Sequence, residues 1–130
     1  MAATRAATIS KEGGMRYILL IYGDEAAFAD MDPGQTSETM EAYDKYSNWL
    51  VEKGWMRAGD PLADTGQATT VRQRDGKVLM TDGPYAETKE QLGGYYIVEC
   101  ANLDEAIEAA QKLPAVAAGG SVEVRPIIDM

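Results

Sequence analysis

The segment Met15–Tyr22, with the sequence MRYILLIY, constrains the fold of this chain more than any other. Successive side chains of an extended strand point to opposite faces, and here both alternating sets are apolar apart from Arg16. A strand that hides both faces from water lies between two layers of a fold. The two faces comprise Tyr17, Leu19 and Ile21 on one side and Ile18, Leu20 and Tyr22 on the other.

A first amphipathic helix is predicted after a polar loop over Gly23–Gln35. Thr36 or Ser37 is a good N-cap for this helix, and Gly54 is a good C-cap. Acidic and amide side chains gather on one side of the helix at 100° per residue, so we expect the opposite side to pack on a sheet. That opposite side comprises Met40, Tyr43, Tyr46, Ser47 and Leu50.

A second helix is predicted between Asn102 and Pro114. Asn102, with Glu105 three residues on, resembles a capping box, and the proline stops the helix. Ala115–Gly120 then forms a small-residue loop. Further strands are predicted at Trp55–Leu62, Ala68–Arg74, Lys77–Thr81, Gly93–Cys100 and Ser121–Ile128, with a hairpin turn at Asp75-Gly76 and a polar loop over Asp82–Leu92.

The resulting order, β-α-β-(hairpin)-β-α-β, predicts an α+β fold of the ferredoxin-like kind, with two helices on one face of an antiparallel sheet. The other face is also apolar and has no second domain to cover it, so we expect a homodimer that pairs through this face. One domain is expected over residues 15–130, after a disordered leader over residues 1–14.

The charge balance excludes several classes of partner. The formal net charge is -9, from 21 acidic and 12 basic residues. Phosphate binding needs clustered positive charge, so we expect neither nucleic acid nor an anionic membrane surface as a partner. The sequence also contains no run long and apolar enough to span a membrane.

The chain has no histidine and one cysteine, Cys100. Zinc sites of the usual nitrogen and sulfur kind and Ser-His-Asp arrangements are therefore excluded. With no internal disulfide possible, the sequence suits a reducing compartment, and we expect a cytoplasmic protein. The carboxylates of the Gly23–Gln35 loop lack the spacing of a calcium loop, so neither a metal nor another cofactor is expected.

The stretch Asp82–Tyr96, DGPYAETKEQLGGYY, resembles the signature of the DGPF branch of the YCII-related proteins, which usually has Phe at the position of Tyr85. The opening Met15–Asp24 and the closing Val122–Pro126 are also similar to the ends of that family. The resemblance implies a ferredoxin-like subunit in a dimeric α/β-barrel assembly. It also implies a setting near sigma factors of the extracytoplasmic-function class, beside which such proteins are often encoded.

Some YCII-like relatives are proposed to use a His–Asp pair, and some process small aromatic compounds. The expected histidine is missing here, since Ala42 or Tyr43 lies nearest its place, whereas Asp60 lies near the relatives' conserved strand end. Acid–base chemistry would therefore depend on Asp60, Glu87 or Tyr43.

Candidate ligand-binding residues gather in two segments: the hairpin with the strand before it, and the turn over residues 82–85 (DGPY here, hereafter the DGPF turn) with the polar loop that follows it. Turn aspartates usually bond their own backbone, and surface arginines usually form ion pairs, so both groups also have a purely structural interpretation. A rigid polar loop beside arginines would equally suit a carboxylate or phosphate. The candidates are Arg57, Arg72, Asp82, Tyr85, Thr88 and Lys89.

Three functions remain open on the sequence. The first is a dimer that binds a small anionic or aromatic molecule in a regulatory or accessory role. The second is a lyase- or isomerase-like enzyme for a small aromatic carboxylate, which Arg72 or Lys89 would hold. The third is an acidic module that binds a protein regulator.

Overall fold

The computed structural model describes residues 14–130, so the expected leader lies outside the described residues except for Gly14. Strands and helices alternate along the chain as the sequence predicts, with three additional short helical segments. The strands are β1 (Met15–Gly23), β2 (Met56–Pro61), β3 (Thr69–Arg74), β4 (Lys77–Asp82), β5 (Gln91–Cys100) and β6 (Ser121–Pro126). The helices are α2 (Glu25–Ala29), α3 (Pro33–Lys53), α4 (Leu103–Gln111) and α5 (Pro114–Ala117), with a 3-10 turn η1 (Thr65–Gln67).

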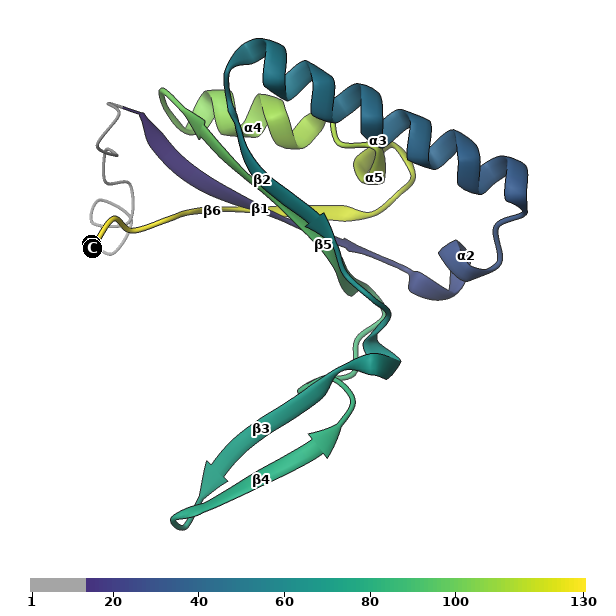
Figure 1. The fold of residues 1–130 in the computed structure, drawn as a ribbon, viewed down its shortest axis with the longest axis vertical. Helices are drawn as coiled ribbons and strands as arrows, with labels where there is room; N and C mark the ends of the chain where they lie inside the picture. Colours follow the sequence, from purple (N-terminus) through teal and green to yellow (C-terminus); the bar gives the residue numbers. More distant parts are fainter. Residues whose placement is uncertain (1–13) are drawn as a thin grey trace.

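The main sheet has four antiparallel strands in the order β2-β5-β1-β6. β1 is central, and its Leu19 lies opposite Tyr96 of β5 and Val124 of β6. Helices α3, α4 and α5 all lie on one side of this sheet (Figure 1). The protein is therefore an α+β protein whose antiparallel sheet and helix layer are compatible with the predicted ferredoxin-like arrangement.

The core forms between the sheet and these helices. Tyr17, Leu19 and Ile21 are buried, which confirms that one face of β1 packs inside the molecule. Tyr46 and Leu50 cover this face from α3, and the Tyr46 hydroxyl donates to the carbonyl of Ala109 in α4 at 2.7 Å. The opposite face of β1 is half-buried and lies on the side of the sheet away from these helices (Figure 1).

Two corrections concern the segment before Gly54. The predicted loop over Gly23–Gln35 contains α2, and α3 begins at Pro33 rather than at Thr36 or Ser37. Asp32 is the true N-cap, since its carboxylate accepts from the Gln35 amide at 2.8 Å while the Gln35 side chain accepts from the Asp32 amide. A proline at the first helical position favours a helix start at Pro33. From sequence alone Pro33-Gly34 favours a loop, because the same pair is also common in turns.

Other boundaries also differ. Met40 is 63% exposed, because the first half of α3 extends beyond the sheet and only the second half packs on it (Figure 1). Pro114 follows α4 but also begins the short helix α5, where a loop was predicted. β5 starts at Gln91, two residues earlier than predicted. Separately, no helix in residues 14–130 is long and apolar enough to cross a membrane.

The two tryptophans lie next to each other at the edge of the core, of which Trp55 is a member and against which Trp49 packs. The rings of Trp49 and Trp55 meet edge to face with centroids 5.7 Å apart. The Nζ atom of Lys53 lies 4.8 Å from the Trp55 centroid, and that of Lys112 lies 5.1 Å from the Trp49 centroid. Cation–π attraction of this kind ties the end of α3 to the end of α4.

The hairpin of β3 and β4 forms a separate two-stranded sheet, as predicted. Asp75 and Gly76 form its turn with φ angles of 52° and 76°, a conformation that Asp and Gly tolerate. The hairpin projects from the end of the main sheet, on the side away from α3, α4 and α5 (Figure 1).

A test of the α3 start compares Asp32→Ala with Ser37→Ala. Loss of the Asp32 cap should lower the free energy of unfolding by about 1 kcal/mol. Ser37→Ala should change it little, because Ser37 lies inside the helix, exposed, where alanine is well tolerated. Urea unfolding followed by circular dichroism measures both, and a larger loss for Ser37→Ala would contradict the observed helix start.

A second test uses the close contact between β2 and β5. A Cβ atom on Gly59 would lie 2.6 Å from Cδ1 of Tyr96, whose ring is buried and whose hydroxyl is 2.8 Å from the Ser47 hydroxyl. Gly59→Ala should therefore lower the free energy of unfolding by about 1–3 kcal/mol. Gly93→Ala is the matched control, since nothing lies within 4 Å of a Cβ there. Equal unfolding midpoints for the two variants would show that the Tyr96 ring moves aside freely.

Candidate functional site

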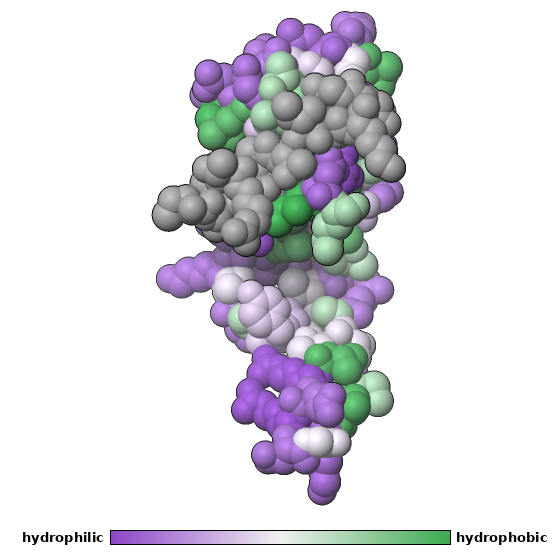
Figure 2. Space-filling model, turned by 90° about the vertical axis from the view of Figure 1, so that its left-hand side faces the viewer, coloured by the Kyte–Doolittle hydropathy of each residue, from purple (hydrophilic) through white to green (hydrophobic). Residues whose placement is uncertain are grey.

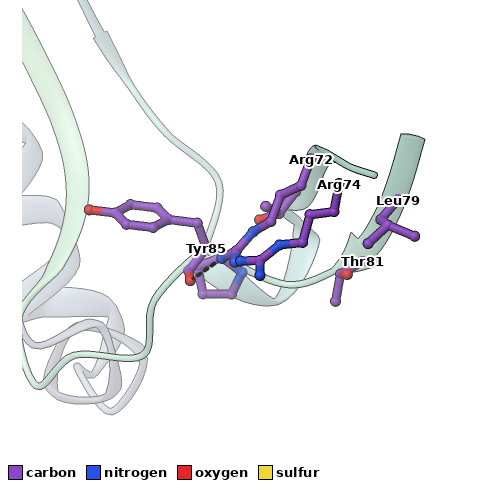
Figure 3. A pocket seen from close by; sticks show the side chains of 7 residues that line it. Arg72, Arg74, Leu79, Thr81 and Tyr85 are labelled. Carbon is purple, nitrogen blue, oxygen red and sulfur yellow. Dashed lines mark hydrogen bonds between the residues drawn. The ribbon is translucent and has the colours of Figure 1, made fainter. Parts of the chain in front are cut away.

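A cleft of about 330 Å³ lies where one face of the hairpin meets the DGPF turn. Arg72 lies opposite Leu79, and Thr70 opposite Thr81, so these side chains share a face of the ribbon. Arg74 lies two residues beyond Arg72 on the same face. The lining comprises Thr70, Arg72, Arg74, Leu79, Thr81, Pro84 and Tyr85, of which five are labelled in Figure 3.

The DGPF turn is fixed to the hairpin by three hydrogen bonds. The Gly83 amide donates to the Ala68 carbonyl at 2.6 Å, and the Thr70 hydroxyl donates to the Gly83 carbonyl at 2.8 Å. The Arg72 guanidinium donates to the Tyr85 carbonyl at 3.0 Å. Gly83 has a φ of 105°, which favours glycine, so this turn holds the cleft wall in one conformation.

The cleft is positively charged although the protein is acidic. Figure 3 shows the guanidinium groups of Arg72 and Arg74 next to the backbone of Tyr85, with the Tyr85 ring directed away from them. Within residues 14–130, neither arginine has a carboxylate oxygen within 4 Å, and the lining contains no acidic residue. Among the described residues these two arginines therefore form no ion pair, and, apart from the Arg72 donor that binds the Tyr85 carbonyl, their donors are available to an anion.

A larger cleft of about 560 Å³ adjoins the first and shares Thr70, Pro84 and Tyr85 with it. It lies at the end of the main sheet, where β1 ends, β5 begins and the chain leaves β2. Glu87 and Thr88 of the predicted site belong to its lining, and the Thr88 hydroxyl donates to the Glu90 carbonyl at 2.5 Å. Its apolar lining includes Tyr22, Leu62, Ala63 and Leu92.

Glu25 and Gln91 connect the loops around this second cleft. The Glu25 carboxylate accepts from the Thr65 amide at 3.1 Å and from the Thr65 hydroxyl. The Gln91 side chain accepts from the Glu25 amide at 3.0 Å and donates to the Thr88 carbonyl at 2.6 Å. Sequence reasoning missed this network, because its members are 40 and 66 positions apart and carry no local motif.

The remaining predicted binding residues lie outside both linings. Arg57 is on β2, where its guanidinium is 3.6 Å from the buried Glu99 carboxylate and donates to the Met56 carbonyl at 2.8 Å. Asp82 ends β4 opposite Thr69 and is exposed. Lys89 is exposed on the loop beyond the turn.

The structure does not bring the three proton-transfer candidates together. Asp60 accepts a 2.8 Å hydrogen bond from the Tyr95 hydroxyl, and this bond raises the pKa of Tyr95. Tyr43 lies on α3, half-buried, where burial and the nearby Tyr96 raise its pKa. Glu87 alone lines a cleft. Because their pKa values are raised, the hydroxyls of Tyr43 and Tyr95 stay protonated at neutral pH, so neither is suited to act as a base.

Metal and thiol chemistry have little support in the described part of the chain. No group of three or more Cys, Asp or Glu side chains there is arranged to hold a metal ion. Cys100 is buried, and burial raises the pKa of its thiol to about 11. The thiol is thus protonated and unreactive at neutral pH.

Comparison with known proteins identifies the family. The chain matches the YCII-related domain over residues 15–130. It is also 38% identical over 114 residues to an uncharacterised protein of Rhizobium meliloti (strain 1021), which covers 87% of this chain and 92% of the relative. The resemblance carried by Asp82–Tyr96 is confirmed, and this chain belongs to the YCII-related family.

Proposed function

We propose that this protein binds a small anionic molecule, with a carboxylate and an aromatic or apolar body, in a regulatory or accessory role. The observation that carries the proposal is the pair of arginines, Arg72 and Arg74, that share one face of a cleft without a carboxylate within 4 Å among the described residues. Guanidinium groups bind carboxylates through paired, charge-assisted hydrogen bonds.

The two adjoining clefts suit the two parts of such a ligand. Its carboxylate would lie on Arg72 and Arg74, where the Thr81 hydroxyl supplies a further donor, whereas the Thr70 hydroxyl already donates to the Gly83 carbonyl. Its ring would extend past Pro84 and Tyr85, which line both clefts, toward the apolar side chains at the end of the sheet. Lining of mixed polar and apolar character is typical of small-molecule sites.

The geometry favours binding over catalysis. An acid–base enzyme needs two titratable groups within reach of one substrate, but Asp60, Glu87 and Tyr43 lie on different parts of the fold. These three candidates therefore do not support a shared acid–base site, and the hypothesis of a protein-binding acidic module would not use the arginine cleft.

We also propose that the protein is a cytoplasmic homodimer of the dimeric α/β-barrel kind. The face of the sheet away from the helices carries Ile18, Leu20, Tyr95 and Ile97, all half-buried, and pairing two such faces would remove them from water. The single buried cysteine suits a reducing compartment.

Calorimetric titration with benzoate, 4-hydroxybenzoate and inorganic phosphate tests the binding site. We expect saturable binding of at least one of these anions, weakened about tenfold or more by Arg72→Ala and by Arg74→Ala through the loss of a charge-assisted hydrogen bond. Arg125→Ala is the matched control, because that exposed arginine pairs with Glu123 on β6, outside both clefts.

Lys89→Ala completes the set, and we expect a smaller effect because Lys89 lines neither cleft. Binding that survives both arginine substitutions, or no binding of any of the three anions, would contradict the proposed site.

A further inference from the structure

The face of the hairpin that carries Arg72 and Arg74 also carries a third cation, Lys77. Lys77 lies opposite Arg74 in the ladder, and Arg72 precedes Arg74 by two residues, so the three side chains share one face. The Cα atoms of Arg74 and Lys77 are therefore about 5 Å apart, and those of Arg72 and Arg74 about 7 Å apart. We call Arg72, Arg74 and Lys77, which are all exposed, the basic row.

The basic row has no compensating acid on its own face of the hairpin. Among residues 14–130, no carboxylate oxygen lies within 4 Å of any of its three cations. The hairpin has two acidic residues, but Asp82 lies opposite Thr69 on the other face, and Asp75 lies in the turn. Figure 2 shows hydrophilic side chains over much of the hairpin and apolar ones along one edge. Like charges directly opposite each other, such as Arg74 and Lys77, destabilise a ribbon.

This repulsion falls on an element that has little stability of its own. The hairpin forms a separate two-stranded sheet, and Figure 1 shows it standing away from α3, α4 and α5. A two-stranded ribbon is marginally stable at best in water. A bound anion would neutralise the repulsion as well as accept hydrogen bonds, and an anion with two charges would neutralise more of it. The basic row therefore favours a doubly charged ligand over a singly charged one.

We infer that the ligand of the proposed site is a dianion of the small aromatic dicarboxylate class, whose second acidic group lies between Arg74 and Lys77. The inference rests on the proposed function, which places the first carboxylate on Arg72 and Arg74. Lys77 lies beyond the lining of that cleft, toward the turn, so a monocarboxylate would leave it unused. Arg74 can bind both acidic groups, because a guanidinium has five N–H donors.

The spread of the cations favours two separate acidic groups over one doubly charged group. Two carboxylates on one ring can each lie between a pair of neighbouring cations of the basic row. A single phosphate group would have to draw all three side chains toward one point, which increases their mutual repulsion and restricts three long side chains. The arrangement therefore suits a dicarboxylate better than a phosphate ester.

Calorimetric titration of the full chain with three ring compounds tests the second acidic group. Isophthalate has two carboxylates, 3-carbamoylbenzoate has a neutral amide in place of one of them, and phenyl phosphate carries its charge in a single group. At low ionic strength we expect isophthalate to bind about tenfold more tightly than 3-carbamoylbenzoate, since each of two exposed ion pairs adds about threefold. This preference should shrink at about 0.15 M salt, because exposed charges are screened.

Substitution of Lys77 tests which cation holds the second group. Lys77→Ala should reduce the preference for isophthalate over 3-carbamoylbenzoate from about tenfold to about threefold, and Lys77→Arg should retain it. Lys45→Ala is the matched control and should leave the preference unchanged, because Lys45 is an exposed lysine that pairs with Glu41 on α3, outside both clefts. Circular dichroism checks that each variant folds.

The outcomes separate this inference from the proposed function. Equal affinities for isophthalate and 3-carbamoylbenzoate, or a preference that Lys77→Ala leaves unchanged, would overturn the second acidic group. Binding of either compound that depends on Arg72 and Arg74 would still support the proposed site. Tighter binding of phenyl phosphate than of isophthalate would also overturn the inference, because it would favour one doubly charged group. If none of the three compounds binds, both the inference and the proposed function are wrong.

Discussion

The fold depends on a central strand, β1, whose side chains are apolar on both faces. Its inner face is covered by α3 and α4, and this contact buries Tyr17, Leu19 and Leu50 almost completely. β5 and β6 flank the strand on both edges, so its backbone groups are paired along most of its length. The outer face of β1, which carries Ile18 and Leu20, is only half-buried in the single chain. The homodimer is proposed because a second copy would cover this face.

The candidate site exists because chain segments distant in sequence end at the same edge of the sheet. β1, β2 and β5 all have an end there, and the hairpin leaves the body at that point. Glu25 and Gln91 hold these ends together, while backbone hydrogen bonds from Gly83 and Thr70 fix the DGPF turn to the hairpin. Rigid loops on a packed scaffold are where binding sites commonly occur.

The sequence predicted the element order, the hairpin turn, the two apolar faces of β1 and the family, because each has a strong local signal, whereas which face of β1 packs on the helices was left open. It misplaced the start of α3, since Pro33-Gly34 resembles a loop until the Asp32 and Gln35 side chains are seen to cap the helix. Arg72 and Tyr85 were predicted as ligand-binding residues from their side-chain chemistry and their place in the hairpin and the turn, and both line the arginine cleft. Arg57 and Asp60 lie on β2 outside both cleft linings, because Arg57 pairs with Glu99 and Asp60 accepts from the Tyr95 hydroxyl, and these partners are brought to them by the pairing of β2 with β5. Partners such as Glu25 and Thr65 meet only through tertiary structure, which no local pattern encodes.

The tryptophan cluster has a consequence for how this molecule can be observed. The chain has two tryptophans, and both lie beside each other next to Lys53 and Lys112, at the junction of helices and sheet. Intrinsic emission excited at the red edge of the indole band therefore reports on that junction alone. The β3–β4 hairpin contains no tryptophan, so its melting would not change this emission. A single-step emission curve therefore reports the unfolding of the main sheet and its helices and not that of the hairpin.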